Sequence, residues 1–507
     1  MQKQTITLVR GLGLLAAVSI IIGNVIGTGV FLKARVMTCN VGSPTWVMIA
    51  WVAAGLLSLA GALTYAELSA MKPEAGGEYV FLRDAYGRLS SFLYGWMQIF
   101  IAKTGSQAAV AVVFAIGMND FLDGKLKQML MRVVFYDTTG WISANPTHFI
   151  YIYELTSLQI VAVMMIIIFT TINCASVVLS GQIATVLTFV KIALIAFVGI
   201  GAFIWVTGGT FSHFGMTEVN GKCEEVKDVV KFGSASYTFI GGFGAAMLAA
   251  LWGFDGWNNL SLVAGEVKNP GKNIPRALIG GTILILFLYV FAHLAYYYVL
   301  DPTAIASVSK DSSVAKEVVS KFFVVNDVKT FATAVAVALF TVGLMLSSIG
   351  TLHTSILTGA RVPYAMAKDG LMFESFGKLS EGTRVPVYAL IFQGLWAVLL
   401  ALSGSFDTLT DYVIFGSWIF YALVTSSVFV FRKRFPNAER PYKAFGYPVV
   451  PILFLLVAAG LLINTMITTP TQSFAGIFLI LLGLPVYYYL TTRNKGEKEE
   501  IKEDVND

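Results

Sequence analysis

Charged residues are scarce in this chain of 507 residues. Asp, Glu, Lys and Arg make up 13% of it, whereas hydrophobic residues make up 56% and the mean hydropathy is +0.73. An average soluble protein carries about 25% charged residues. A soluble core cannot hide this much apolar surface. The composition therefore excludes an ordinary soluble protein and indicates a lipid bilayer as the surroundings.

Residues that carry metal or catalytic chemistry are also few. The three cysteines, Cys39, Cys174 and Cys223, are too few for a disulfide framework. The four histidines are scattered, and no CxxC or His/Cys cluster suggests a metal site. The sequence has no Walker motif, HExxH or GxSxG, and its apolar runs hold no paired carboxylates. We expect no catalytic residues, no cofactor, no metal, no nucleic-acid partner and no ATP-driven step within this chain.

Long uncharged runs dominate the sequence instead. A helical crossing of a bilayer needs about 20 apolar residues, whereas a β-barrel would show short alternating strands. The runs predict an all-α integral membrane protein of twelve helical spans: 11–32, 44–71, 89–120, 155–174, 180–207, 236–265, 276–300, 328–364, 386–405, 408–431, 447–468 and 473–491.

The loops between these spans differ in their positive charge. Lys and Arg are more numerous in the loops that share a side with the N-terminus, and the clusters 268–276 and 432–434 sit at span ends. Both termini are therefore expected to be cytoplasmic in a multi-pass protein of the cell membrane. The tail 493–507 is charged and is predicted to be disordered.

Glycine interrupts two of the predicted spans. The first span contains GNVIGTG at 23–29, and the sixth contains WGFDGW at 252–257. Each interruption opens a set of five spans, and an odd number of spans inverts the second set. We predict inverted repeats over 1–207 and 208–434, followed by two peripheral spans in 435–492. Paired interruptions at matching positions are typical of a transporter binding site.

The glycines of the first span allow two interpretations. They either form a face for close helix packing or unwind the helix. Gly27, Thr28 and Gly29 are too close in sequence to share one helix face, which favours unwinding. Unwound backbone is tolerated in a membrane where it lines a cavity or meets a ligand. An amino-acid zwitterion meets both needs, because helix N-termini attract its carboxylate and free carbonyls accept from its ammonium.

Five stretches resemble the amino acid–polyamine–organocation superfamily, most closely its bacterial members related to the L-type amino acid transporters and serine/threonine exchangers. They are IIGNVIGTGVF (21–31), PEAGGEYVFLRDAYG (73–87), LWGFDGWNNLSLVAGEVKNPGKNIPRA (251–277), ARVPYAMAKDG (360–370) and GLPVYYYL (483–490). The resemblance extends over nearly the whole chain. It implies the leucine-transporter fold, with spans 1 and 6 unwound at mid-membrane.

The resemblance also assigns binding roles by position. The carboxylate clamp falls on Gly27, Thr28 and Gly29, and Trp252 becomes an aromatic gate over the substrate. The ammonium acceptors fall on the carbonyls of Val25, Trp252 and Asp255. The side chain of Asp255 has two open roles, which are reinforcing ammonium binding and capping the following half-helix.

Lys191 is the most informative charge inside a span. A buried ammonium is costly in a membrane and is usually functional, although a lysine can also snorkel to the surface. In relatives a lysine here lies beside the first broken helix, where sodium sits in sodium-coupled members. The resemblance therefore implies a coupling role for Lys191.

The sequence gives weaker evidence for residues that would support the binding site. Asn258 is expected to hold the second interruption open, and Ser347 and Ser348 match the region that faces the sodium-equivalent position. Lys103 has no counterpart that we can place. Glu67 is expected in an ion pair, and His353 in a structural role.

These features predict a secondary transporter of L-amino acids, with sodium-independent exchange of neutral substrates as the leading interpretation. A proton-coupled symporter and a carrier of cationic amino acids or polyamines remain open alternatives. A non-transporting amino-acid sensor is the alternative outside this class. Animal members pair with a heavy chain through an external cysteine between spans 3 and 4. The loop 121–154 has no cysteine, so we expect no disulfide-linked heavy chain.

Overall fold

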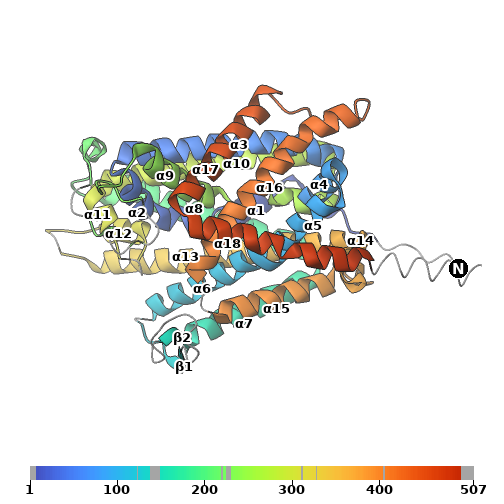
Figure 1. The fold of residues 1–507 in the computed structure, drawn as a ribbon. Helices are drawn as coiled ribbons and strands as arrows, with labels where there is room; N and C mark the ends of the chain where they lie inside the picture. Colours follow the sequence, from blue (N-terminus) through green and yellow to red (C-terminus); the bar gives the residue numbers. More distant parts are fainter. Residues whose placement is uncertain are drawn as a thin grey trace, which may run out of the picture.

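The computed structural model describes residues 7–122, 124–136, 149–218, 221–223, 226, 230–309, 312–326, 328–403 and 406–492. The predicted disordered tail lies outside these residues. The described chain forms an elongated bundle of helices that run along a common direction (Figure 1). One two-stranded antiparallel sheet of β1 (Met129–Tyr136) and β2 (Phe149–Thr156) lies at one end of it.

Two sets of elements build the bundle before its last two helices. The first set contains α1 (Leu14–Val25), α2 (Gly29–Val41), α3 (Pro44–Met71), α4 (Glu78–Tyr86), α5 (Arg88–Met97), the π-helix η1 (Gln98–Ala102), α6 (Lys103–Phe121), α7 (Ser157–Ala175) and α8 (Val177–Trp205). The second set contains α9 (Phe239–Phe254), the 3-10 helix η4 (Asn259–Glu266), α10 (Pro270–Val299), α13 (Phe331–Gly359), α14 (Arg361–Lys368), α15 (Val387–Ser403) and α16 (Phe406–Arg434).

The remaining elements are peripheral or short. The last two described spans contain α17 (Val449–Thr468) and α18 (Pro470–Leu481), and the helical stretch of α18 continues to Thr492. Short helices in the connections are η2 (Phe211–Gly215), α11 (Pro302–Ala306), α12 (Val314–Val319) and η5 (Glu374–Gly377).

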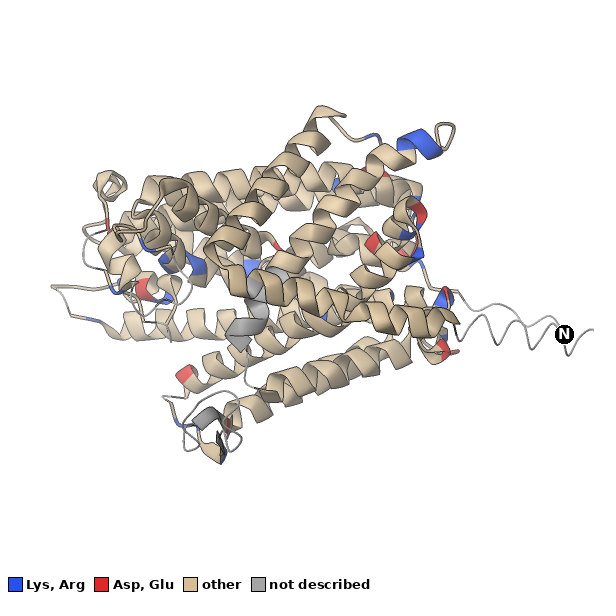
Figure 2. Ribbon diagram, viewed as in Figure 1, with Lys and Arg blue, Asp and Glu red and all other residues tan. Residues whose placement is uncertain are grey.

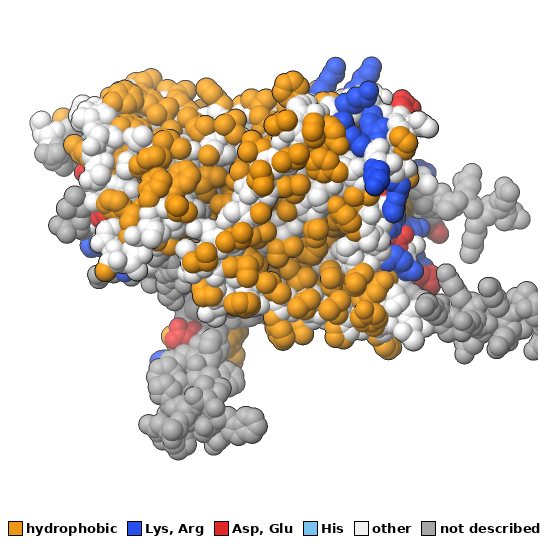
Figure 3. All heavy atoms as spheres, turned by 45° about the horizontal axis from the view of Figure 1, so that its top comes forward, with side chains coloured by type: hydrophobic (Ala, Val, Ile, Leu, Met, Phe, Trp, Pro, Cys, Tyr) orange, Lys and Arg blue, Asp and Glu red, His pale blue; other side chains and the backbone are white. Residues whose placement is uncertain are grey.

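Eleven helical stretches of the described residues are long and apolar enough to cross a membrane, and α15 is a shorter apolar helix of 17 residues. The predicted count of twelve spans therefore depends on α15. Figure 3 shows a side of the bundle covered by hydrophobic side chains, with Lys and Arg gathered at one end. The ribbon view places the same charges at the end that holds α4 and α14 (Figure 2). A broad apolar flank with basic residues at one end is what a membrane-spanning bundle requires.

The first span differs most from its prediction. Its charge-free run ends at residue 32, but the helical stretch continues through α2 to Val41. Two charges, Lys33 and Arg35, follow the run, and the fold gives both of them partners. The Lys33 ammonium lies 4.4 Å from the centroid of the Trp252 ring, and the Arg35 guanidinium donates to the carbonyls of Ala306 (3.2 Å) and Lys222 (3.1 Å). By contrast, the second span has the predicted bounds, 44–71.

A disulfide joins Cys39, near the end of α2, to Cys223 in the loop before α9, with a Cα–Cα distance of 5.6 Å. One bond is not a framework, yet it is a cross-link that the cysteine count did not predict. The partners lie 184 positions apart in sequence. The same loop hydrogen-bonds to the end of α2, where Phe232 N donates to Cys39 O (2.8 Å) and Glu218 N donates to Gly42 O (2.7 Å).

Burial separates inner helices from peripheral ones. In the most apolar window of the first span, Leu14–Val41, 78% of the residues are buried, against 17% for the last span, Ser473–Thr492. The helix α1 packs against α8, α10 and α13, and α2 packs against α9. Both interruptions therefore lie in the interior of the bundle.

Candidate functional site

The first interruption comprises Ile26, Gly27 and Thr28, between the end of α1 and the start of α2. A helix that stops in the interior leaves carbonyl oxygens without intrahelical partners. The Lys191 ammonium, which α8 carries into the interior, donates to the carbonyls of Gly23 (2.7 Å) and Ile26 and to the Thr351 hydroxyl (2.7 Å). Three oxygens use all three N–H donors of this buried ammonium. The structure thus places Lys191 against the first interruption, as the resemblance implies.

The helix α13 also supports this turn. Thr351 and Ser347 both place their hydroxyls within hydrogen-bond distance of the Ile26 carbonyl, at 3.2 Å and 3.4 Å. Ser348 differs, because its hydroxyl donates to the Leu344 carbonyl of its own helix (3.0 Å). Of the two predicted serines, the structure brings Ser347 to the interruption and turns Ser348 toward its own backbone.

The second interruption comprises residues 255–258, between the end of α9 and the start of η4. Gly256 has a φ of +99°, a conformation that L side chains rarely adopt. The Asp255 carboxylate accepts a hydrogen bond from the Tyr421 hydroxyl of α16 (2.6 Å). Asn258 donates to the Glu78 carboxylate (2.6 Å), which ties the turn to the segment between spans 2 and 3.

Tyr289 of α10 joins the two interruptions. Its hydroxyl lies 2.9 Å from the Val25 carbonyl and 2.9 Å from the Gly253 carbonyl. The Val25 carbonyl also accepts from Gly27 N (2.8 Å). The Val25 carbonyl, which the resemblance assigns as an acceptor for the substrate ammonium, therefore already accepts hydrogen bonds from two groups of the protein in this structure.

Trp252 packs over the beginning of α2. A Cβ atom added to Gly29 would lie 3.2 Å from the indole Cε3 and 2.8 Å from Gly253 Cα, so glycine is needed for this close approach. The half-buried indole also meets the Lys33 ammonium, which lies 4.4 Å from the ring centroid. This position beside the first interruption suits the gate role that the resemblance assigns.

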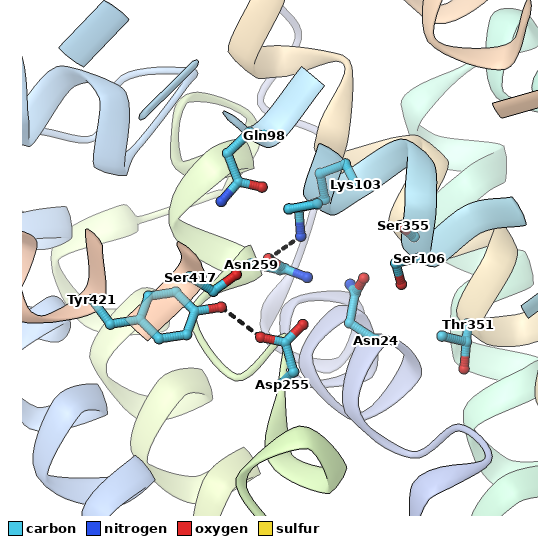
Figure 4. A pocket seen from close by; sticks show the side chains of 11 residues that line it. Asn24, Gln98, Lys103, Ser106, Asp255, Asn259, Thr351, Ser355, Ser417 and Tyr421 are labelled. Carbon is cyan, nitrogen blue, oxygen red and sulfur yellow. Dashed lines mark hydrogen bonds between the residues drawn. The ribbon is translucent and has the colours of Figure 1, made fainter. Parts of the chain in front are cut away.

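A small polar cavity lies between the two interruptions (Figure 4). Its empty volume, which includes space open to solvent, is about 350 Å³. Its lining comes from α1, η1, α6, the second interruption, η4, α13 and α16: Asn24, Gln98, Ala102, Lys103, Ser106, Asp255, Asn259, Thr351, Ser355, Ser417 and Tyr421. Asn24 and Thr351 connect it to the first interruption.

The predicted binding residues are distributed unevenly around this cavity. Asp255 lines it, whereas Val25, Gly27, Thr28, Gly29 and Trp252 lie beside it without forming part of the lining. The Asp255 side chain points toward Tyr421 (Figure 4).

Lys103 is the functional candidate that the sequence left unplaced. It lines the cavity and donates to the Asn259 side chain (Figure 4). Its signal in the sequence was a charge inside a span, which is costly unless it has a partner. It directly follows the π-helix η1, and such segments are frequent at functional sites.

Glu78, which accepts a hydrogen bond from Asn258 of the second interruption, is a further residue that the sequence did not indicate. Its fully buried carboxylate accepts from Tyr65 (2.9 Å), Tyr94 and Asn258, all neutral donors. Burial raises the pKa of the Glu78 carboxyl above its ordinary value, against the hydrogen bonds and the attraction of Lys103, which lower it. The other two fully buried carboxylates described here, Glu67 and Glu266, instead accept from arginines.

Each of these two carboxylates forms a two-point pair with one arginine. Arg361 forms a two-point pair with Glu266 at 2.7 and 2.8 Å, and both side chains are fully buried. Arg432 pairs with Glu67 at 3.0 and 2.7 Å, which confirms the ion pair expected for Glu67. His353 lies 2.9 Å from the Ser180 carbonyl, in agreement with a structural role. Within the described residues no group of three or more His, Cys, Asp or Glu could hold a metal ion.

Comparisons of the sequence relate this chain to known transporters. The sequence model of one family, described as amino acid permease, matches residues 12–489. The serine/threonine exchanger SteT of Bacillus subtilis (strain 168) is 30% identical over 96% of this chain and 97% of its own length. The b(0,+)-type amino acid transporter 1 of Mus musculus is 26% identical over 96% and 89%, respectively. The large neutral amino acids transporter small subunit 2 of Mus musculus is 28% identical over 95% and 81%. These relatives are transporters, which confirms the expectation that the chain is not an enzyme.

Proposed function

This chain belongs to the amino acid permease family of the amino acid–polyamine–organocation superfamily, and we propose that it exchanges neutral L-amino acids across the cell membrane by alternating access. The observation that carries this proposal is the polar cavity between two interrupted helices, with the ammonium of Lys191 fixed on the first interruption. In this proposal the fold has twelve spans with inverted repeats over 1–207 and 208–434, and both termini are cytoplasmic.

Substrate recognition uses the backbone of the two interruptions. The carboxylate binds the N–H groups of Gly27, Thr28 and Gly29, at the start of α2, where the helix dipole favours an anion. The ammonium approaches the carbonyls of Val25, Trp252 and Asp255. In this structure Tyr289 and Gly27 N both donate to the Val25 carbonyl. The arriving ammonium takes the place of the Tyr289 hydroxyl there, and Gly27 N leaves this carbonyl to bind the carboxylate.

Sodium independence follows from the position of Lys191. Its ammonium supplies a fixed positive charge on the carbonyls of the first interruption, which would otherwise suit a cation. Alternating access then consists of closing the interrupted helices over the substrate while one bundle rocks against the other. The sequence between spans 3 and 4 offers no cysteine for a heavy chain, and we propose that none is required.

Transport by purified protein in proteoliposomes tests the proposal. Vesicles preloaded with unlabelled amino acids should take up labelled amino acid faster than empty vesicles, without sodium and without a pH gradient. If uptake into empty vesicles follows a pH gradient instead, the protein is a proton-coupled symporter and not an exchanger. Binding without flux would identify a sensor.

A further inference from the structure

The lining of the cavity is unusual in its polarity. Small-molecule sites are mostly apolar with a few polar groups, whereas Ala102 is the one apolar residue among the eleven that line this cavity. A substrate side chain that enters it therefore meets hydrogen-bonding groups on nearly every side.

Two of these groups are ionisable and of opposite sign. The Lys103 ammonium donates to the side-chain Oδ1 of Asn259, and the Asp255 carboxylate accepts from the Tyr421 hydroxyl (Figure 4). The ammonium offers donors and no acceptor, and the carboxylate offers acceptors and no donor. One cavity thus presents a donor and an acceptor together.

The two charges also oppose charged substrates. A cationic side chain meets the repulsion of Lys103 together with the attraction of Asp255, and an anionic one meets the reverse. Because the two opposite charges line one cavity, a charged side chain of either sign gains little net attraction to offset the loss of its hydration. The geometry consequently disfavours the carrier of cationic amino acids or polyamines that Asp255 alone had left open.

Apolar side chains face a different penalty. A leucine side chain in this cavity would displace water without replacing its hydrogen bonds, and an unpaired buried polar group costs about 1–3 kcal/mol. Sites built to hydrogen-bond a substrate group discriminate strongly against analogues that lack the group.

We propose that Lys103, Asn259, Asp255 and Tyr421 form a side-chain subsite for small neutral polar amino acids, which carry a hydroxyl or a carboxamide. Lys103 is the specificity-determining residue. The subsite rests on the proposed transport function and adds to it the class of substrate.

A competition panel tests the subsite. Uptake of labelled serine into preloaded proteoliposomes is measured against unlabelled serine, threonine, asparagine, leucine, lysine and glutamate. The proposal expects serine and asparagine to inhibit at concentrations about tenfold or more below leucine, because one unpaired polar group is worth about that factor. Equal inhibition by leucine overturns the subsite and leaves transport intact. Absence of uptake for any amino acid overturns transport, and the subsite with it.

Variants sharpen the assignment. Lys103→Met should lower the preference for serine over leucine about tenfold. Lys103→Gln, which keeps a donor without the charge, should retain the preference and admit lysine as an inhibitor. The matched control is Thr104→Val, because Thr104 is buried on the same helix but donates to the Ile99 carbonyl and does not line the cavity. An unchanged preference in Lys103→Met, or the same change in the control, contradicts the role of Lys103.

Discussion

The two interruptions share a glycine-rich sequence but differ in how their polar groups are used. At the first, the protein supplies a buried cation, and Lys191 donates to two backbone carbonyls and one hydroxyl. At the second, the turn carries its own anion, and Asp255 faces a cavity that Lys103 also lines. This difference in charged partners shows that two helix interruptions in one protein can have different roles. We interpret the first interruption as the support for backbone recognition and the second as the place where side chains are selected.

The largest effect is expected from Lys191→Ala. The change leaves the Gly23 carbonyl without its lysine partner and the Ile26 carbonyl with the Thr351 and Ser347 hydroxyls alone. A buried polar group left unpaired costs about 1–3 kcal/mol, or a factor of about 10–100. Uptake in proteoliposomes should fall by that factor while the protein still inserts and purifies. Lys316→Ala is the control, because Lys316 is partly exposed and pairs with Asp120 outside the site. Normal flux in Lys191→Ala would remove the distinction between the two interruptions.

A smaller effect is expected from Asp255→Asn. The substitution keeps the size of the side chain but weakens the hydrogen bond from Tyr421, which a charged acceptor makes about twice as strong. Serine uptake should fall roughly tenfold, and glutamate should become a better inhibitor because the repelling charge is gone. Asp120→Asn serves as the control. A loss as complete as that of Lys191→Ala, with no change in the order of inhibitors, would speak against a selective role.

Trp252→Ala should change affinity more than turnover. The indole packs over Gly29 at the start of α2, and removing it opens one side of the proposed carboxylate clamp. We expect the apparent KM to rise about 3–10-fold, since a lost contact of this kind is worth about 1 kcal/mol. Trp46→Ala, an exposed tryptophan of α3, provides the control. If both KM and maximal rate are unchanged, Trp252 is not a gate.

The smallest effect concerns pH and Glu78. The raised pKa means that this carboxyl takes up a proton at a higher pH than an exposed glutamate does. Protonation turns one acceptor into a donor, and the hydrogen bond from Asn258 is weakened. Exchange should therefore decline a few-fold as the pH falls through the pKa of Glu78, which lies above that of an exposed glutamate.

Glu78→Gln should flatten this pH profile, because the amide does not titrate. Glu74→Gln changes a half-exposed glutamate of the same segment and should keep the wild-type profile. Identical profiles for wild type and Glu78→Gln would assign the pH dependence elsewhere.

Local patterns predicted much of the fold. The uncharged runs located the apolar helices, and the second span came out at the predicted 44–71. The glycine clusters located both interruptions, and a charge inside an apolar run located Lys191. Each of these signals is contained in a short stretch of sequence.

Long-range partners were not predictable in the same way. Lys33 and Arg35 ended the first predicted span because their partners, the Trp252 ring and the carbonyls of Ala306 and Lys222, are distant in sequence. The Cys39–Cys223 bond and the pairing of Lys103 with Asn259 were missed for the same reason. A pattern reveals that a buried charge needs a partner, but only the fold identifies that partner.

Counterflow measures the central claim most directly. Proteoliposomes loaded with unlabelled serine and diluted into trace labelled serine should accumulate label transiently, without sodium or a pH gradient, whereas vesicles with Lys191→Ala should not. The account predicts this contrast between two proteins that insert equally well. Equal accumulation in both, or no accumulation by the wild-type protein with any amino acid, would contradict it.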